Sequence, residues 1–426
     1  MQFYRKSFYK NTIQIPGDKS ISHRALLFNS LTKGTVRIEN LLMGEDVQAT
    51  IACLRQLGIE IHFKDNICIL TGRGGSYLQP EEVLNCENSG TTMRLFLGLL
   101  APHALKVVLS GDESLSTRPM DRVTQYLEPL GVRYEGSRNL APIYQIGCPS
   151  IPWFESDLYI ASAQMKSSLL LTGLQSCGCT VRGGKNSRDH TERMLRAMGA
   201  TVVQSSNGDV TIEPTQLMAT DIIVPNDISS ASFFIVAALL LPNAEIELPN
   251  IGINPTRDGI LRVLQIMGAD IQIQNRREVG GEPVGDLVVC TSNLTGVEVP
   301  IDWVPTMIDE IPILALAASQ ATGRTVIRGA ADLRKKESDR IHAIVCSFRE
   351  MGIEVEEFED GLAIEGPQPI VDNHVHCFGD HRITMTAAIA ALISFEELVI
   401  DSITSVDTSF PTFWMLLEAL AAPESA

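Results

Sequence analysis

Hydrophobic and polar positions follow one pattern that recurs along the 426-residue chain. The pattern starts with apolar residues at helical spacing, continues with a glycine, and ends in the apolar–polar alternation that is typical of a strand. It occurs five times, with successive glycines 68 to 84 residues apart, in LRQLGIEI (54–61), LEPLGVRY (127–134), LRAMGATV (195–202), LQIMGADI (264–271) and FREMGIEV (348–355). Glycine suits this place because it tolerates the left-handed backbone that ends a helix. The pattern predicts a repeated structural unit, and a sixth helix, 413–422, ends the chain where the next glycine would stand.

A second series of segments is apolar on nearly every helical face. The segments are rich in small residues and lie at 21–32, 91–101, 163–175, 230–241, 310–321 and 382–394. A helix that is apolar all round is buried all round. We therefore predict an α/β fold of six units, each with one buried helix, one amphipathic helix and strands between them. A plain two-layer sandwich would expose too much of the buried helices, so strands and outer helices are expected to surround them.

Each buried helix is preceded by a polar loop. The loops read GDKS, ENSG, SDLYIASA, NDISS, MIDE and FGDH. The first turn of a helix has free N–H groups and a partial positive charge, so it favours anions. If the six helix N-termini converge, they form an anion-binding wall.

Charged side chains gather in or near these loops. The candidate cations are Lys19, Arg24, Arg94, Arg118, Arg188, Lys336, Arg340, His381 and Arg382, and the candidate carboxylates are Asp227, Asp309, Glu337 and Asp380. A cation at a helix N-terminus is disfavoured by the helix dipole. Because the same conflict recurs in several units, the pattern indicates that a bound anion resolves it.

Some of these residues also have a purely structural interpretation. Asp309 in TMIDEIP is also a candidate helix N-cap, and Arg94 either contacts a ligand or only braces its loop. Lys336 and Arg340 stand four residues apart in RKKESDR, a spacing that places both on one face of a helix. Such a like-charged pair is unfavourable in water, so it indicates either a ligand-binding face or an ordinary solvated helix.

The overall charge limits the partners. The chain has 34 basic and 51 acidic residues, a net charge of −17. This balance argues against binding to nucleic acid or to an anionic membrane, because both need a basic surface. A local group of cations still dominates its surroundings within a Debye length of about 8–10 Å. Small anionic ligands therefore remain compatible with the composition.

Nothing in the sequence predicts a membrane span, an export signal or a metal site. One of the longest apolar runs, 231–241, is shorter than the ~20 residues of a membrane span, and the N-terminal segment lacks the apolar core of a signal peptide. The nine cysteines are scattered without zinc spacing, which favours reduced thiols and a cytoplasmic protein. The segment HVHCFGDH (374–381) offers metal-ligating side chains, but the alternation of His374 and His376 fits one face of a strand. We expect neither a metal nor a cofactor.

Five segments resemble the signatures of the EPSP synthase (3-phosphoshikimate 1-carboxyvinyltransferase) family. They are PGDKSISHRAL (16–26), ENSGTTMRL (87–95), LSTRPMDR (115–122), RKKESDR (334–340) and GDHRITM (379–385). The resemblance implies a two-domain inside-out α/β barrel with three units in each domain. One domain would span 15–227 and the other 1–14 with 228–426. The active site would lie in the cleft, closing when substrates bind, and a monomer is expected.

The resemblance also implies the reaction. The family moves the enolpyruvyl group of phosphoenolpyruvate onto the 5-hydroxyl of shikimate 3-phosphate and releases phosphate, by addition and then elimination through a tetrahedral intermediate. The step belongs to chorismate and aromatic amino acid biosynthesis. Both substrates carry several negative charges, which would explain the clustered cations. Proton transfers to the methylene carbon and from the attacking hydroxyl need acids and bases within hydrogen-bond reach.

Site residues follow from the resemblance, position by position. Shikimate 3-phosphate would be bound by Lys19, Ser20, Arg24, Ser162, Ala163, Gln164, Arg188, Asp309 and Lys336. Phosphoenolpyruvate would be bound by Lys19, Gly90, Arg118, Gln164, Arg340 and Arg382. Asp309 would accept the proton of the 5-hydroxyl, Glu337 is the candidate proton donor to the methylene carbon, and Lys19 would take part in proton transfer. The proton route among Lys19, Asp309, Glu337 and His381 stays open.

The sequence departs from the family pattern at two places. Thr408 stands where many relatives have a lysine, and Ala163 replaces a second serine. Gly90 keeps the glycine beside the phosphoenolpyruvate site, which predicts room for the inhibitor glyphosate.

Two alternative functions differ in what they require. The sister enzyme that transfers enolpyruvyl to UDP-N-acetylglucosamine usually has a loop cysteine where this chain has Glu113, and it lacks the pattern of Ser20 and Arg24. A non-catalytic anion-binding protein on the same fold would need the cations but not Asp309 and Glu337.

Overall fold

The computed structural model describes residues 9–371, 374–394 and 397–421, and these divide into two compact units. The N-terminal unit comprises Gly17–Pro225 and the short segment Glu278–Glu282. The C-terminal unit comprises the other described residues. Residues 1–8 and 422–426 of the predicted second domain, including the last residue of the predicted helix 413–422, lie outside the described residues. Among the helices of the described ranges, none is long and apolar enough to cross a membrane.

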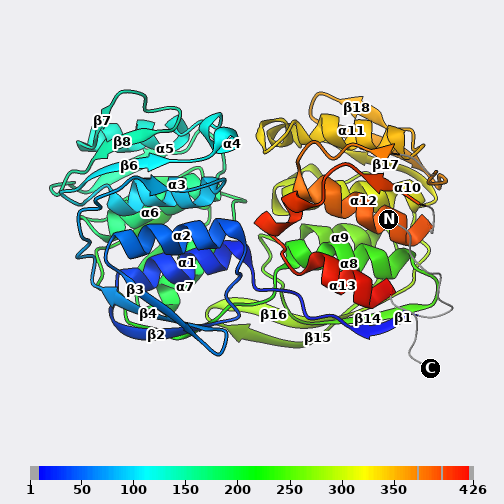
Figure 1. Ribbon diagram of the computed structural model, residues 1–426, viewed down its shortest axis with the longest axis horizontal. Helices are drawn as coiled ribbons and strands as arrows, with labels where there is room; N and C mark the ends of the chain where they lie inside the picture. Colours follow the sequence, from blue (N-terminus) through cyan, green and yellow to red (C-terminus); the bar gives the residue numbers. More distant parts are fainter. Residues whose placement is uncertain (1–8, 372–373, 395–396, 422–426) are drawn as a thin grey trace. The chain divides into compact units, whose positions relative to one another are not determined.

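The N-terminal unit alternates strands and helices (Figure 1). Its strands are β2 (Lys33–Glu39), β3 (Glu60–Lys64), β4 (Ile67–Arg73), β5 (Leu84–Asn85), β6 (Lys106–Ser110), β7 (Arg133–Glu135), β8 (Ile143–Ile146), β9 (Phe154–Asp157), β10 (Cys179–Arg182), β11 (Val202–Gln204), β12 (Val210–Ile212) and β13 (Ile222–Ile223). Its helices are α1 (Lys19–Ser30), α2 (Glu45–Gln56), α3 (Gly90–Leu100), α4 (Glu113–Ser116), α5 (Asp121–Leu127), η1 (Glu128–Leu130), α6 (Ala163–Leu174) and α7 (His190–Ala197).

The C-terminal unit repeats this alternation. Its strands are β1 (Tyr9–Thr12), β14 (Ala244–Gly252), β15 (Asp270–Val279), β16 (Glu282–Cys290), β17 (Gly323–Ile327), β18 (Glu356–Phe358), β19 (Gly361–Gly366), β20 (His374–Val375) and β21 (Val399–Ile400). Its helices are α8 (Ile228–Leu240), α9 (Gly259–Ile266), η2 (Ile301–Thr306), η3 (Ile308–Glu310), α10 (Ile311–Gln320), η4 (Ala331–Lys335), α11 (Arg340–Glu350), α12 (His381–Ser394), η5 (Thr404–Thr408) and α13 (Phe413–Ala421).

The sheets share one plan, which is the structural counterpart of the sequence repeat. Four sheets have equivalent orders, β13-β2-β4-β3, β5-β6-β8-β7, β9-β10-β12-β11 and β1-β14-β16-β15. In each, the first strand is parallel to the second, and the third is antiparallel to the second. The sheet β17-β19-β18 has three strands, with a parallel bridge from Glu298 to Val326 on its β17 side. The last described sheet pairs β20 with β21.

The five glycines of the repeat adopt the backbone that the sequence predicts. The φ angles are +86° at Gly58, +94° at Gly131, +90° at Gly199, +97° at Gly268 and +81° at Gly352. All lie in the left-handed region that disfavours side chains with a Cβ atom. The prediction of a helix stop at each glycine is confirmed.

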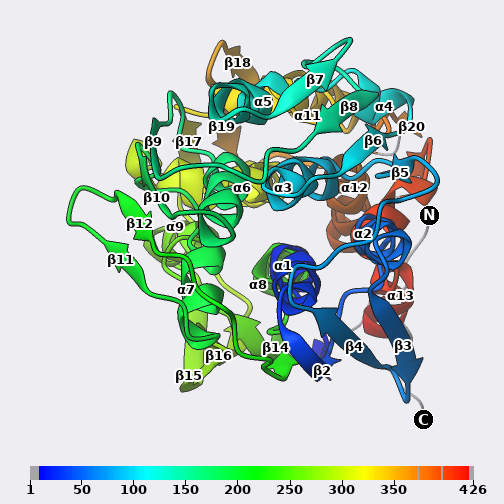
Figure 2. The same cartoon turned by 90° about the vertical axis from the view of Figure 1, so that its left-hand side faces the viewer.

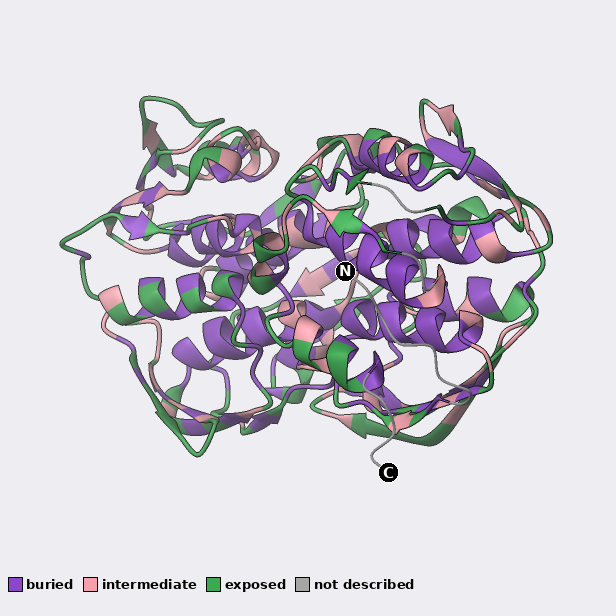
Figure 3. Ribbon diagram, turned by 45° about the vertical axis from the view of Figure 1, so that its right-hand side comes forward, coloured by how far each residue is buried: buried purple, intermediate pink, exposed green. Residues whose placement is uncertain are grey.

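The six predicted buried helices are confirmed as α1, α3, α6, α8, α10 and α12, whose residues are mostly inaccessible to solvent (Figure 3). In each unit these central helices lie between sheets (Figures 1 and 2). Their packing leaves little room for polar groups, so polar side chains near their N-termini must bond to one another or to a ligand.

The three central helices of the C-terminal unit run in the same direction. Their N-terminal residues Ser229, Glu310 and Arg382 contact one another. The C-terminal residues Leu240, Gln320 and Ser394 line one pocket at the other end. The partial positive charges of these three N-termini therefore meet at one place.

Candidate active site

The N-terminus of α1 holds the first cationic group in the N-terminal unit. Asp18 caps the helix, accepting from the backbone N–H of Ile21 at 2.8 Å. Lys19, the first helical residue, pairs with Asp46 of α2 at 2.9 Å and is partly exposed. The Asp46 carboxylate thus partly compensates the repulsion between the Lys19 ammonium group and the positive end of the helix dipole.

Arg24 is buried one turn further along α1. Its Nε donates to Thr191 Oγ1 at 2.8 Å, its Nη1 to the carbonyl of Ser20 at 2.9 Å, and its Nη2 to Ser167 Oγ at 2.7 Å. Burial lowers the pKa of Arg24 to about 10, and the charge of nearby Arg188 also lowers it. The guanidinium still carries its charge at neutral pH. A guanidinium has five N–H donors, so two remain for an anion after these three bonds.

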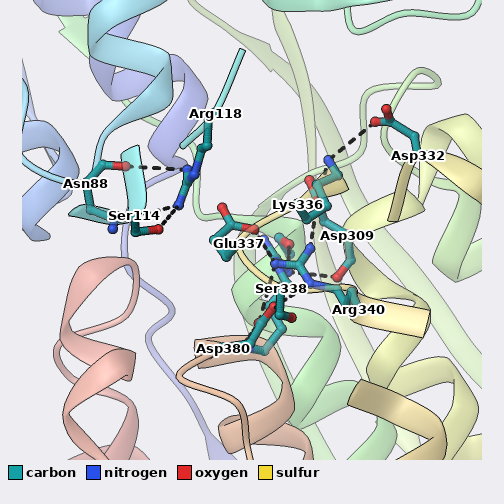
Figure 4. Close-up of polar contacts among 12 residues, drawn as sticks. Asn88, Ser114, Arg118, Asp309, Asp332, Lys336, Glu337, Ser338, Arg340 and Asp380 are labelled. Carbon is teal, nitrogen blue, oxygen red and sulfur yellow. Dashed lines mark hydrogen bonds and ion pairs between the residues drawn. The ribbon is translucent and has the colours of Figure 1, made fainter. Parts of the chain in front are cut away.

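Arg118 is held by the loop that precedes α3. Its Nη2 donates to Asn88 Oδ1 at 2.8 Å and to Ser114 Oγ at 3.1 Å (Figure 4). Gly90, the first residue of α3, lies beside it, since a Cβ atom at position 90 would stand 3.6 Å from Arg118 Nη1. The same Cβ atom would stand 2.9 Å from Arg94 Nη1. The space at Gly90 is therefore bounded by two guanidinium groups.

Arg94 links α3 to two neighbours. Its Nη1 donates to Gln164 Oε1 at 2.8 Å, and its Nη2 to the carbonyl of Pro119 at 3.3 Å. Gln164 Nε2 in turn donates to Thr91 Oγ1 at 2.9 Å. These bonds agree with the brace interpretation of Arg94, because they fix Gln164 and the residue after Arg118. Ser162 caps α6 through the N–H of Met165, and Ala163 is the first residue of that helix.

Arg340 is the centre of the cluster in the C-terminal unit (Figure 4). Its Nε donates to Asp380 Oδ2 at 2.8 Å and its Nη2 to Glu337 Oε2 at 2.6 Å, and its Nη1 lies 3.4 Å from Asp309 Oδ1. Burial by itself would lower the pKa of Arg340, but Asp380, Glu337 and Asp309 outweigh burial and raise it. Burial would likewise raise the pKa of Asp380, and the charges of Arg340 and His381 hold it below its usual value.

Lys336 also bonds to the carboxylate of Asp309, but Lys336 does not lie in the predicted helix. Its Nζ lies 3.3 Å from Asp309 Oδ1. The prediction that Lys336 and Arg340 share a helix face is wrong, because Lys336 has an extended backbone and α11 begins at Arg340. Asp339 caps α11 by accepting from the N–H of His342 at 3.1 Å, and this cap stops the helix from extending back to Lys336.

Asp309 and Arg382 meet at the N-termini of α10 and α12. Arg382 Nη1 donates to the carbonyl of Asp309 at 3.0 Å and to Ser229 Oγ at 2.7 Å. The N-cap interpretation of Asp309 is wrong, because Asp309 lies in η3 and Glu310 occupies the N-cap position of α10. The structure thus brings together Asp309, Lys336, Glu337, Arg340 and Arg382 in one group of the C-terminal unit, with Asp380 and His381 next to it.

The family model of EPSP synthase (3-phosphoshikimate 1-carboxyvinyltransferase) matches residues 5–417. The chain belongs to the EPSP synthase family. Relatives named 3-phosphoshikimate 1-carboxyvinyltransferase include that of Bacillus cytotoxicus, 44% identical over 98% of this chain and 99% of the relative, and that of Petrotoga mobilis, 45% identical over 96% of both. A solved EPSP synthase structure from Acinetobacter baumannii has a TM-score of 0.89 at 38% identity, covering 98% of this chain and 97% of that one. The mixed α/β two-domain fold of the EPSP synthases is therefore also that of this chain.

This member of the EPSP synthase family has site neighbours that the sequence reasoning missed. Asp46 pairs with Lys19, Thr191 and Ser167 hold Arg24, and Ser229 holds Arg382. All four come from helices distant in sequence from the cation that they contact. Three of them are small hydroxyl residues, which give no periodic signal in an apolar helix.

No metal centre is found in the described parts of the chain. They contain no group of three or more His, Cys, Asp or Glu side chains arranged to hold a metal ion. His376, one of the metal-ligating side chains in the segment HVHCFGDH, instead bonds Glu350 at 2.7 Å. This carboxylate raises the pKa of His376.

Proposed function

We propose that this chain transfers the enolpyruvyl group of phosphoenolpyruvate to the 5-hydroxyl of shikimate 3-phosphate and releases phosphate. The observation that carries the proposal is the similarity to 3-phosphoshikimate 1-carboxyvinyltransferases over nearly the whole chain. The grouped cations and carboxylates support it, because two polyanionic substrates need positive charge and their reaction needs acids and bases.

Shikimate 3-phosphate is assigned to the residues that the family resemblance gives for it. These are Lys19, Ser20, Arg24, Ser162, Ala163, Gln164, Arg188, Asp309 and Lys336. Arg24 is buried and already fixed by three hydrogen bonds, so its two remaining N–H groups are pre-oriented for a phosphate oxygen.

Phosphoenolpyruvate is assigned to Lys19, Gly90, Arg118, Gln164, Arg340 and Arg382. Arg340 is surrounded by three carboxylates and is 1% exposed. Four of its five N–H donors bond to these carboxylates, so a substrate carboxylate or phosphate that binds Arg340 through two N–H groups has to replace one of them. Glu337 is the most exposed of the three, with 30% of its side chain accessible. Once displaced from Arg340, Glu337 loses the cation that keeps it ionised and can take up the proton that it would donate as an acid.

The proposed reaction has two steps that balance protons. In the addition step, Asp309 accepts the proton of the 5-hydroxyl, the hydroxyl oxygen bonds to C2 of phosphoenolpyruvate, and the methylene carbon gains a proton from Glu337 or Lys19. In the elimination step, the new methyl group returns a proton to the group that donated it, the double bond re-forms as the bond from C2 to the phosphate oxygen breaks, and the released phosphate carries away the proton that Asp309 had accepted. Lys336 and Arg340 lie within 3.4 Å of the Asp309 carboxylate, so they set its orientation for the first step.

Substrate choice is the experiment that tests this function. We expect the purified protein to release phosphate from phosphoenolpyruvate with shikimate 3-phosphate, and not with UDP-N-acetylglucosamine. Initial rates of phosphate release with each acceptor, and with none, give the answer. Release only with UDP-N-acetylglucosamine would support the sister enzyme, and release with neither would leave the non-catalytic anion-binding protein.

A methyl group at position 90 should weaken the binding of phosphoenolpyruvate and of glyphosate. In Gly90→Ala the new Cβ atom meets Arg94 Nη1 at 2.9 Å, closer than real Cβ contacts come, so the guanidinium has to shift. Overpacking of this kind costs ~1–3 kcal/mol, so we expect KM for phosphoenolpyruvate and the inhibition constant of glyphosate to rise about 5- to 100-fold. Inhibition of the unaltered enzyme should be competitive with phosphoenolpyruvate. Indifference of the unaltered enzyme to millimolar glyphosate would disprove the assignment of Gly90.

A further inference from the structure

Two buried residues, Ser229 and Glu310, contact the guanidinium group of Arg382. Ser229 is near the N-terminus of α8, Glu310 is at the N-cap position of α10, and Arg382 is near the N-terminus of α12. Ser229 is 3% exposed and Glu310 is fully buried. The three side chains therefore tie the N-termini of the three central helices of the C-terminal unit to one another.

The chemistry of this contact fixes the direction of its hydrogen bonds. An ionised carboxylate can only accept, and a hydroxyl has one proton to donate. Ser229 therefore donates to Glu310 Oε1, and its lone pairs accept from Arg382 Nη1 at 2.7 Å. With the carbonyl of Asp309 as its second acceptor, both protons of Arg382 Nη1 are engaged by the protein.

The remaining donors of Arg382 are not used in this way. Among the residues that the structure describes, none accepts a hydrogen bond from Nε or Nη2 of Arg382 within the distances of ordinary hydrogen bonds. One edge of the guanidinium is thus anchored while the other donors are left for a ligand. A planar, pre-oriented fork of this kind loses little conformational entropy when it binds a carboxylate or phosphate.

Arg257 is a second guanidinium beside the same carboxylate oxygen of Glu310. Its Nη2 lies 3.6 Å from Glu310 Oε1 and 3.5 Å from Asp227 Oδ1, and it is 3% exposed. A fully buried carboxylate needs a buried cation as its partner. Arg257 supplies that charge next to the Glu310 oxygen that accepts the hydrogen bond of Ser229.

We infer that Ser229 and Glu310 are positioning residues that hold the guanidinium of Arg382 in the orientation that binds phosphoenolpyruvate. The inference rests on the assignment of Arg382 to phosphoenolpyruvate in the proposed function. Neither residue contacts a reacting atom; both act through Arg382. Loss of the hydroxyl leaves Nη1 with one acceptor, so the guanidinium can pivot about its bond to the Asp309 carbonyl.

Steady-state kinetics of Ser229→Ala test this role. We expect KM for phosphoenolpyruvate to rise about tenfold, the scale of a lost hydrogen bond to a charged group. KM for shikimate 3-phosphate should stay within about twofold and kcat within about threefold, because the lost bond concerns ground-state and transition-state binding alike. Ser229→Thr keeps the hydroxyl and should restore KM for phosphoenolpyruvate.

Ser319→Ala is the matched control. Ser319 is a fully buried serine of a central helix in the same unit, but it lies near the C-terminus of α10 and donates only to the carbonyl of Leu316 at 2.8 Å. We expect both KM values of Ser319→Ala to match those of the unaltered enzyme. A selective rise in KM for phosphoenolpyruvate in this control would show that loss of any buried hydroxyl produces the effect, and would overturn the inference.

A double-mutant cycle separates positioning from general stability. Glu310→Gln alone should raise KM for phosphoenolpyruvate, because an amide is a weaker acceptor for Ser229. In the Ser229→Ala background the same change should add less than about twofold, since Glu310 acts through the missing hydroxyl. Independent, multiplicative effects would overturn the inference, as would equal changes in both KM values.

If Ser229→Ala does not fold, Glu310→Gln compared with the unaltered enzyme gives the same selective readout. Failure of the unaltered enzyme to use shikimate 3-phosphate would instead overturn the proposed function.

Discussion

Asp309→Ala should lower kcat at least about 100-fold, because it removes the group proposed to accept the proton of the 5-hydroxyl. Binding of shikimate 3-phosphate should stay within about tenfold, because its proposed cationic ligands Lys19, Arg24 and Arg188 are unchanged and a single hydrogen bond contributes about that factor. Steady-state rates of phosphate release and calorimetric titration with shikimate 3-phosphate measure the two quantities separately.

Asp332→Ala is the control for this experiment. Lys336, which bonds Asp309, also approaches Asp332, whose Oδ2 lies 4.0 Å from Lys336 Nζ (Figure 4). About half of the Asp332 side chain is exposed to solvent. An exposed ion pair of this kind contributes little, so Asp332→Ala should keep kcat within about twofold. An Asp309→Ala enzyme with unchanged turnover would remove Asp309 from the mechanism.

Of the proposed variants, Lys166→Ala should lower the free energy of unfolding the most. Lys166 of α6 pairs with Glu192 of α7 at 2.6 Å, and the two side chains are 1% and 0% exposed. Removal of Lys166 leaves the Glu192 carboxylate buried without its ion-pair partner, which costs about 3–5 kcal/mol. Glu192 is adjacent in sequence to Thr191, which holds Arg24, so we also expect a higher KM for shikimate 3-phosphate. Chemical denaturation followed by circular dichroism measures the stability change.

Arg182→Ala provides a comparison in which the ion-pair distance is nearly the same and the burial differs. Arg182 pairs with Glu155 at 2.7 Å, with exposures of 39% and 53%. Water screens this pair, so its loss should leave the denaturation midpoint nearly unchanged. If the two variants shifted the midpoint equally, burial would not be what makes the Lys166–Glu192 pair important.

The parts of the fold that the sequence predicted depend on local patterns. All-round hydrophobicity placed the segment 163–175 as a buried helix, and the structure has α6 at Ala163–Leu174. The glycine pattern predicted helix stops, and Gly131 has the left-handed φ of +94° that the stop requires. Both signals lie within about a dozen residues of sequence, the range in which propensity and periodicity act.

The parts that the sequence did not predict depend on contacts between distant segments. The charges of RKKESDR suggested a helix through Lys336, but Asp339 caps α11 and Lys336 turns to Asp309, 27 residues earlier in the chain. The sequence did not indicate a role for Ser229 or Glu310. Their contact with Arg382 depends on the packing of three helix N-termini that are distant in sequence. Motif resemblance named the ligand-binding candidates, but not the residues that orient them.

The most direct test of the account is the reaction run in deuterium oxide. With phosphoenolpyruvate and shikimate 3-phosphate, addition followed by elimination protonates the methylene carbon and then removes a proton. We therefore predict stoichiometric phosphate release and a product whose enolpyruvyl methylene group contains deuterium, detected by mass spectrometry and NMR. A product without deuterium, or no phosphate release with shikimate 3-phosphate, would contradict the account.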